Sequence, residues 1–279
     1  MPLVSGAEVV LAAAKAGRGV GAFNVIQLEH AIALIAGAEQ AGAPVILQIS
    51  ENAVKYHGAL KPIGVATLAA AAAASVPVVV HLDHAMDRDL VTEAVSLGFT
   101  SVMYDGSKLE YADNVAATGE VTKFCHDHGV FVEAEIGEVG GKDGVHAPGA
   151  RTRPDEAVAF AEATGVDALA VAVGSSHAMT ERTATLDFEL IGELHAAVAV
   201  PLVLHGSSGV ADPDLTRAVE AGMTKVNIAT HLNNVFTASV RQTLEANPKL
   251  VDTRKYLGPA RAAVAAEVAR LLGVLKAVY

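Results

Sequence analysis

The sequence alternates regularly between short apolar runs and longer stretches of helical character, and this alternation constrains the fold most strongly. The apolar runs are expected to form eight strands, near residues 20–25, 44–50, 77–82, 100–105, 130–136, 167–173, 201–205 and 224–229. Alanine-rich or amphipathic stretches between them are expected to be helices, near residues 28–41, 64–75, 87–97, 108–128, 154–164, 187–197 and 212–221, with another after residue 231. Eight strand–helix units predict an α/β protein with a (β/α)8 TIM barrel.

The alternative to a closed barrel is a doubly wound open sheet. That fold is disfavoured because no Gly-x-Gly-x-x-Gly motif follows the first strand. The chain has no linker or low-complexity segment, so residues 1–279 are expected to form a single domain. Ser5 to Glu8 resembles a capping box, which predicts an extra N-terminal helix, and additional C-terminal helices are expected after the eighth strand.

Composition and charge exclude several classes of function. Hydrophobic residues make up 52% of the chain, enough for a large core, and the net charge of −11 argues against a nucleic-acid surface. The uncharged run 62–80 is long enough to span a membrane, but it is alanine-rich and Pro77 divides a helix from a strand. No secretory signal is visible, and the single cysteine, Cys125, permits no internal disulfide. The chain is therefore expected to be cytoplasmic, without nucleic-acid or membrane partners.

Polar residues stand at the carboxyl end of every predicted strand. This is the end at which TIM barrels build their active sites. The residues are Asn24, Gln48, Ser50, Asp83, His84, Asp105, Glu133, Glu135, His177, His205, Asn227 and Thr230. Polar residues commonly end strands, which accounts for any one of them. It accounts poorly for a set of carboxylates, amides and histidines that contains almost no lysine or arginine.

Three of the strand ends carry a histidine, and this repetition predicts a metal site. A lone histidine is more often a structural residue, but His84, His177 and His205 each follow an apolar strand. Three histidines match the ligand count of a catalytic zinc that keeps its fourth position open.

Glycine-rich turns add a predicted ligand to this site. Residues 205–209 follow the seventh strand and residues 227–230 lead from the eighth strand into a helix. Both suit a phosphate group, which barrels commonly bind after strands seven and eight, although the glycines also fit tight turns alone. A third stretch, Gly137 to Gly144, is charged and long, and is either a mobile lid or a solvated surface loop.

The order of these motifs resembles the class II ketose-bisphosphate aldolases. The motifs are His-Leu-Asp-His (81–84), Glu-Ala-Glu-Ile-Gly (133–137) with Gly-Gly after it, Gly-Ser-Ser-His (174–177), Leu-His-Gly-Ser-Ser-Gly (204–209) and Lys-Val-Asn-Ile-Ala-Thr (225–230). The resemblance extends from residues 22–24 to residues 254–257 and is greatest to the short form shared by fructose- and tagatose-bisphosphate aldolases. It implies a lyase of carbohydrate metabolism, in glycolysis for the fructose enzyme, that acts on sugar bisphosphates and triose phosphates.

The resemblance also implies the roles of individual residues. It assigns a catalytic Zn²⁺ to His84, His177 and His205, an acid/base role to Asp83, and a second or alternate metal position to Asp105 and Glu135. Phosphate binding falls to Gly206, Ser208, Asn227 and Thr230, and the pocket lining to Asn24 and Ser50. Arg254 is expected to reach the distal phosphate of a neighbouring subunit in a homodimer or homotetramer, and a monovalent cation, Na⁺ or K⁺, is expected near the phosphate.

The chain departs from the family pattern at two positions. Ala178 follows the second zinc histidine, where many relatives carry glycine, and its methyl group would crowd the phosphate. The lid motif is one residue short, so the acid that transfers the carbon-bound proton has two candidates, Asp143 and Glu138.

The chemistry leaves rival interpretations open. A Schiff-base aldolase needs a lysine that projects into the barrel; Lys225 begins the eighth strand and is expected at the end opposite the mouth. A zinc metallohydrolase barrel would use similar histidines, and an inert metal-binding scaffold is compatible with the short lid. Fructose 1,6-bisphosphate, its C4 epimer tagatose 1,6-bisphosphate and related phosphorylated ketoses are not distinguished by the motifs.

Overall fold

The eight strands form one closed parallel barrel in which each strand pairs with the next and β8 pairs with β1. The computed structural model describes residues 2–136, 151–177 and 179–277. The strands are β1 (Val20–Asn24), β2 (Val45–Ser50), β3 (Val78–Ala85), β4 (Ser101–Tyr104), β5 (Phe131–Glu135), β6 (Ala168–Ala170), β7 (Leu202–Leu204) and β8 (Met223–Ile228). Nearly every strand residue is buried, because the barrel interior covers one face and the helices cover the other.

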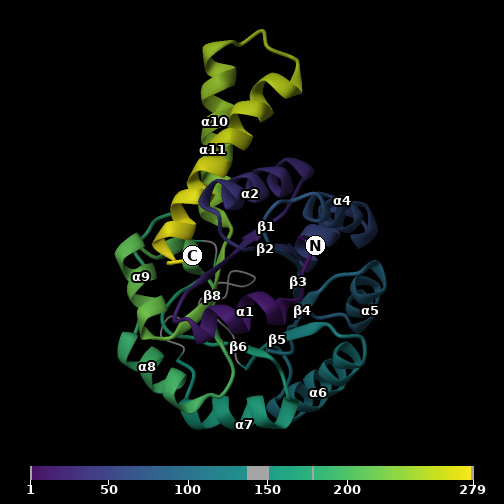
Figure 1. Ribbon diagram of the computed structural model, residues 1–279, viewed down its shortest axis with the longest axis vertical. Helices are drawn as coiled ribbons and strands as arrows, with labels where there is room; N and C mark the ends of the chain where they lie inside the picture. Colours follow the sequence, from purple (N-terminus) through teal and green to yellow (C-terminus); the bar gives the residue numbers. More distant parts are fainter. Residues whose placement is uncertain (1, 137–150, 178, 278–279) are drawn as a thin grey trace.

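Helices surround the barrel and connect consecutive strands (Figure 1). They are α2 (Leu28–Ala41), α3 (Glu51–His57), α4 (Leu60–Ala72), α5 (Arg88–Leu97), α6 (Tyr111–Asp127), α7 (Pro154–Thr164), α8 (Phe188–Ala197) and α9 (Asp212–Ala221). The predicted (β/α)8 architecture is confirmed. The sequence pattern missed α3, whose seven residues include only two buried apolar side chains, Ala53 and Val54.

Helix α1 (Gly6–Lys15) closes the barrel at the amino-terminal ends of the strands. Its predicted capping box is present, with the Ser5 side chain bonded to the Glu8 backbone and the Glu8 side chain returning the bond. Val9, Val10 and Ala13 on one face of α1 pack against the lower barrel interior. The interior residues of this cluster are Val20, Ala22, Ile46, Val79, Phe131, Ala168, Ala170 and Val203. We call this cluster, with its three α1 residues, the floor of the barrel.

The chain ends in two long helices, α10 (Thr230–Ala246) and α11 (Thr253–Val274), which form an antiparallel hairpin that projects from the barrel body (Figure 1). The part of α11 nearest the barrel body packs against α2 (Figure 1). The predicted C-terminal helices are therefore present. No helix in the described ranges combines the length and the apolar character needed to cross a membrane.

Candidate active site at the barrel mouth

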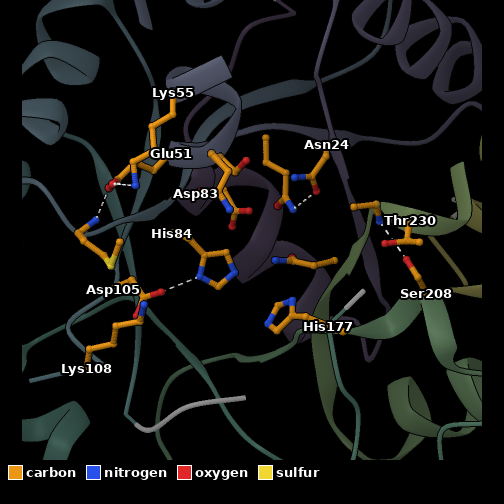
Figure 2. A pocket seen from close by; sticks show the side chains of 17 residues that line it. Asn24, Glu51, Lys55, Asp83, His84, Asp105, Lys108, His177, Ser208 and Thr230 are labelled. Atoms are coloured by element: carbon orange, nitrogen blue, oxygen red, sulfur yellow. Dashed lines mark hydrogen bonds and ion pairs between the residues drawn. The ribbon is translucent and has the colours of Figure 1, made fainter. Parts of the chain in front are cut away.

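The carboxyl ends of the strands enclose a pocket of about 350 Å³. Eleven of the residues singled out from the sequence line it: Asn24, Gln48, Ser50, Asp83, His84, Asp105, His177, Gly206, Ser208, Asn227 and Thr230. Figure 2 shows that His84 and His177 lie near its centre, with Ser208 and Thr230 on one side and Glu51, Lys55 and Lys108 on the other. The strand-end pattern therefore predicted the position of the pocket and most of its lining.

The three histidines converge from β3, from the segment after β6, and from the end of β7. The ring centroids of His84 lie 5.3 Å from His177 and 4.7 Å from His205, and those of His177 and His205 lie 5.6 Å apart. Each ring can offer one nitrogen so that all three nitrogens lie within 4.8 Å of one another. A second set of donors with the same spacing combines His84 with Asp105 and Glu135.

A local break in β3 brings His84 into this group. In a regular strand Asp83 and His84 would point to opposite faces of the sheet. The register between β3 and β4 shifts between Leu82 and Ala85, and His84 has a left-handed φ of 50°. Such a backbone is costly for a residue with a Cβ and is typical of functional sites. The bulge turns the imidazole toward the pocket, where its Nδ1 lies 2.9 Å from Asp105 Oδ2.

His205 is fully buried just behind the pocket wall, between two carboxylates. Its Nε2 lies 2.9 Å from Glu133 Oε1 and its Nδ1 lies 3.2 Å from Glu135 Oε2. Burial lowers the pKa of His205, but the two carboxylates outweigh burial and raise this pKa to about 9. A ring nitrogen and a carboxylate oxygen that face each other need a positive species between them, either a proton or a metal ion.

These residues fit a zinc ion on chemical grounds. Imidazole nitrogen and carboxylate oxygen are both zinc ligands, and three histidines with an open position are typical of catalytic rather than structural sites. The raised pKa of His205 indicates that its surroundings already favour positive charge at the place where a metal would bind.

Asp83 lies beside these histidines and is buried, with 2% of its surface exposed. Its Oδ1 has no hydrogen-bond partner among the described residues. Burial raises the pKa of Asp83, but the neighbouring His84, Lys225 and His205 outweigh burial and hold this pKa below its usual value. The carboxylate is therefore ionised at neutral pH and has an oxygen available for a proton.

The turn after β7 and the start of α10 form the opposite side of the pocket. Gly206 has a left-handed φ of 66°, and a Cβ there would lie 2.6 Å from the Ser176 backbone, so glycine is required. Ser208 Oγ accepts hydrogen bonds from the backbone N–H groups of Ala229 and His231, each at 3.2 Å. The positive end of the helix dipole at the start of α10 favours an anion, which supports the predicted phosphate position.

The sequence patterns missed part of the pocket wall, because it comes from α3 and from the loops after β3 and β4. Glu51 accepts a hydrogen bond from the Met86 backbone at 2.7 Å and pairs with Lys55 at 2.8 Å. Lys108 lines the same wall. The only sequence signal for α3 is Ser50, whose side chain caps the helix by accepting from the Ala53 backbone.

The remaining predicted residues fall in three places. Glu135 is buried next to His205, outside the pocket lining. Arg254 lies at the tip of the α10–α11 hairpin, 87% exposed and paired with Asp252, and the structure does not bring it to the pocket of its own chain. Glu138 and Asp143, and the departure at Ala178, lie outside the described residues.

The expected position of Lys225, low on the eighth strand and outside the pocket, is confirmed, and the structure adds the direction of its side chain. Its backbone lies low on β8, paired with Val20 of β1, but its side chain extends along the barrel interior rather than away from the mouth. Its Nζ lies 2.9 Å from Asn227 Oδ1 and 2.7 Å from Glu133 Oε2. The ammonium is 1% exposed and does not line the pocket, so a substrate in the pocket does not reach it as a Schiff-base nucleophile would require.

Comparison with known proteins agrees with this geometry. The family model described as fructose-bisphosphate aldolase class-II matches residues 4–278. A Bacillus subtilis protein named a probable fructose-bisphosphate aldolase is 41% identical over 95% of this chain and 94% of its own. A Staphylococcus aureus fructose-bisphosphate aldolase is 39% identical over the same shares.

Solved structures show the same relationship. The YdjI aldolase of Escherichia coli K12 matches with a TM-score of 0.85 and 29% identity, over 99% of this chain and 98% of its own. A Campylobacter jejuni fructose-bisphosphate aldolase, at 22% identity and a TM-score of 0.81 over 99% of this chain and 96% of its own, shares the fold. Sequence and structure therefore agree that this chain is an aldolase, a lyase, and that it belongs to the class II fructose-bisphosphate aldolase family.

Proposed function

We propose that this chain catalyses the reversible cleavage of fructose 1,6-bisphosphate to dihydroxyacetone phosphate and glyceraldehyde 3-phosphate. The observation that carries the proposal is the convergence of His84, His177 and His205, with ligand atoms within 4.8 Å of one another, in one pocket with an anion-binding turn. Zinc dependence is a trait of the family. The relatives' names supply the fructose substrate.

In this proposal the three histidines hold Zn²⁺, and Asp105 and Glu135 form an alternate position that shares His84. A Zn²⁺ ion held there would supply Lewis-acid stabilisation for the negative charge left when the C3–C4 bond breaks, a contribution of several kcal/mol. Gly206, Ser208, Asn227 and Thr230 hold the phosphate next to C1, and a monovalent cation, Na⁺ or K⁺, lies near that phosphate.

Asp83 is the proposed acid/base for the oxygen-bound proton. During cleavage its Oδ1 takes the proton of the C4 hydroxyl, and during condensation it returns that proton. Its lowered pKa keeps it ionised, and its free oxygen atom faces no competing donor among the described residues. The carbon-bound proton is assigned to Asp143 or Glu138 in the stretch after β5.

The second phosphate of the substrate needs positive charge at the other end of the pocket. Lys55 and Lys108 line the wall across the pocket from Ser208 and Thr230 (Figure 2). Asn24 and Ser50 complete the lining between the two walls. Arg254 is proposed to act on the pocket of a second copy in a homodimer or homotetramer, because its position at the hairpin tip is remote from its own pocket.

We also propose a cytoplasmic location and a role in carbohydrate metabolism. The fully buried thiol of Cys125 and the lack of a second cysteine suit a reducing compartment.

A coupled assay for triose phosphates over a panel of ketose bisphosphates tests the function. We expect turnover of fructose 1,6-bisphosphate, loss of activity with a chelator, recovery with Zn²⁺ or Co²⁺, and no inactivation by borohydride in the presence of substrate. Faster cleavage of tagatose 1,6-bisphosphate would reassign the substrate. Release of inorganic phosphate would indicate a metallohydrolase, binding without turnover a scaffold, and covalent trapping on a lysine a Schiff-base enzyme.

A further inference from the structure

A chain of buried charged groups leads from the lower barrel interior to His205. Lys225 Nζ lies 2.7 Å from Glu133 Oε2, and Glu133 Oε1 lies 2.9 Å from His205 Nε2. None of the three side chains is more than 1% exposed. Lys225 and Glu133 do not line the pocket, so neither touches a substrate there.

The chemistry of the contact fixes which nitrogen of His205 is protonated. An ionised carboxylate can only accept a hydrogen bond, so Nε2 of His205 donates its hydrogen to Glu133. In a neutral imidazole the other nitrogen then carries the lone pair. That nitrogen, Nδ1, is the one that faces Glu135, which belongs to the second set of candidate metal ligands.

Glu133 in turn depends on Lys225. A buried carboxylate without a counter-charge is costly, and Lys225 is the nearest cation to its second oxygen. His81 is a weaker partner, because its Nε2 lies 3.9 Å from that oxygen and its Nδ1 is engaged by Ser101 at 2.7 Å. Lys225 also bonds Asn227 Oδ1 at 2.9 Å, so the same ammonium contacts a residue of the proposed phosphate site.

We propose that Glu133 and Lys225 are positioning residues that act through His205. Glu133 holds His205 in the tautomer and orientation that present Nδ1 to the metal, and Lys225 balances and orients the Glu133 carboxylate. The inference rests on the proposed metal site. Carboxylate partners of metal-bound histidines typically change metal affinity by about 10- to 100-fold when removed.

The test is the metal affinity of a double variant, Lys225→Met with Glu133→Gln. Each single change would leave one buried charge unmatched, whereas the double change removes both charges and nearly preserves the shape. The Zn²⁺ dissociation constant of the metal-free protein is measured by competition with a chromophoric chelator. The visible spectrum of the Co²⁺ form reports the ligand field. We expect affinity to fall by about 10- to 100-fold and the Co²⁺ bands to shift.

A matched control is available on the wall of the same pocket. Lys55→Met with Glu51→Gln removes a Lys–Glu pair of similar length, 2.8 Å, and neither member bonds a proposed metal ligand directly. Its Zn²⁺ affinity and Co²⁺ spectrum should match the wild type. A parallel loss in this control would show that the effect is one of general pocket charge and would overturn the inference.

Wild-type affinity and an unchanged Co²⁺ spectrum in the folded Lys225/Glu133 double variant would also overturn it. If that variant does not fold, Glu133→Asp decides the question. It keeps the charge beside Lys225 and withdraws the carboxylate from His205 by one methylene, so metal affinity should still fall. Failure of the proposed site itself gives a different result, because the wild-type chain would then bind no stoichiometric zinc.

Discussion

The two ends of the barrel use the same strands for opposite purposes. At the floor, β1, β2, β3 and β5 present Val20, Ile46, Val79 and Phe131 to the apolar face of α1. At the mouth the same four strands present Asn24, Ser50, Asp83 and Glu135. Among the described strand residues other than glycine, His84 at the mouth has a left-handed backbone conformation. The apolar floor therefore provides stability, whereas the polar side chains and the strained backbone, which cost folding free energy, lie where chemistry is proposed.

The strongest way to sharpen this contrast is to remove the proposed metal ligands. His84→Ala, His177→Ala or His205→Ala should each lower bound zinc and reduce kcat/KM by about 10³-fold, because several kcal/mol of Lewis-acid stabilisation are lost. Metal analysis and steady-state kinetics measure both. His57→Ala and His195→Ala are the controls and should retain zinc. Full zinc occupancy in the His177 variant would exclude that residue as a ligand.

The second prediction separates acid/base chemistry from metal binding at the mouth. Asp83→Ala should keep zinc while kcat for cleavage falls by roughly 10²–10⁴-fold, the usual contribution of a positioned acid/base. Exchange of the triose C–H hydrogen with deuterated water should be far less affected, since the proposed role of Asp83 is limited to the oxygen-bound proton. Asp143→Ala and Glu138→Ala are the complementary variants, and one of them should slow exchange. Equal loss of cleavage and exchange in Asp83→Ala would refute this division.

The third prediction concerns the floor. Phe131 is 4% exposed and packs in the floor cluster. Phe131→Ala should lower the free energy of unfolding by about 3–5 kcal/mol, because it leaves a cavity in a closed end of the barrel. Zinc content and KM of the folded enzyme should stay near wild type. Denaturant titration and kinetics on one preparation provide the check, and a loss of zinc without a loss of stability would reverse the contrast.

A smaller effect is expected at the phosphate turns. Ser208→Ala and Asn227→Ala should each raise KM for bisphosphates on the order of 10-fold, the result of losing one or two charge-assisted hydrogen bonds. Unchanged KM values in both variants would place the phosphate elsewhere. Thr216→Val, on an outer helix with its hydroxyl bonded to the Val274 carbonyl at 2.9 Å, is a suitable control.

The smallest effect tests whether every charge near the mouth serves chemistry. Asp212, at the start of α9, pairs with Arg182 and Arg270. Burial raises the pKa of Asp212, but these guanidinium groups outweigh burial and lower this pKa. A carboxyl whose pKa is lower in the folded state stabilises the fold above its unfolded pKa of about 3.9 and loses that contribution as pH falls through the folded value.

Asp212→Asn should therefore lower Tm by roughly 2 °C at pH 7, in keeping with a partly exposed ion pair. The difference should shrink as the pH is lowered below about 4, where the carboxyl of the unfolded chain becomes protonated, and should vanish as the pH falls through the lower pKa of the folded state. Thermal unfolding at several pH values measures it. Catalysis at pH 7 should not change, and a constant Tm difference across the whole pH range would contradict the ion-pair explanation.

Most of the fold could be predicted from the sequence because the hydrophobic pattern of a strand differs from that of a helix, and the strand–helix unit repeats eight times. Helices α2, α7 and α9 begin and end where the patterns place them. The strand ends also predicted most of the pocket, since parallel strands in a barrel deliver their carboxyl ends to one mouth. Strand β6 is shorter than expected, Ala168–Ala170 against 167–173, because its last residues leave the ladder to form the segment that carries His177.

What could not be predicted depends on side-chain direction and local backbone. Simple alternation would have pointed His84 away from Asp83, and only the bulge after Leu82 explains why both face the pocket. The Cα position of Lys225, low on β8, was predicted, but it does not reveal that the four-carbon side chain reaches Glu133 and Asn227. Both features depend on backbone geometry and long-range contacts that no window of sequence contains.

The closed floor also determines how molecules move through this enzyme. Helix α1, only ten residues long, blocks the barrel at one end, so the part of the chain that the structure describes leaves the pocket open at the mouth and closed at the floor. A long substrate cannot thread through it, and both products must depart by the route that the substrate used to arrive. An apolar helix that lines no part of the pocket thereby confines both binding and release to the mouth.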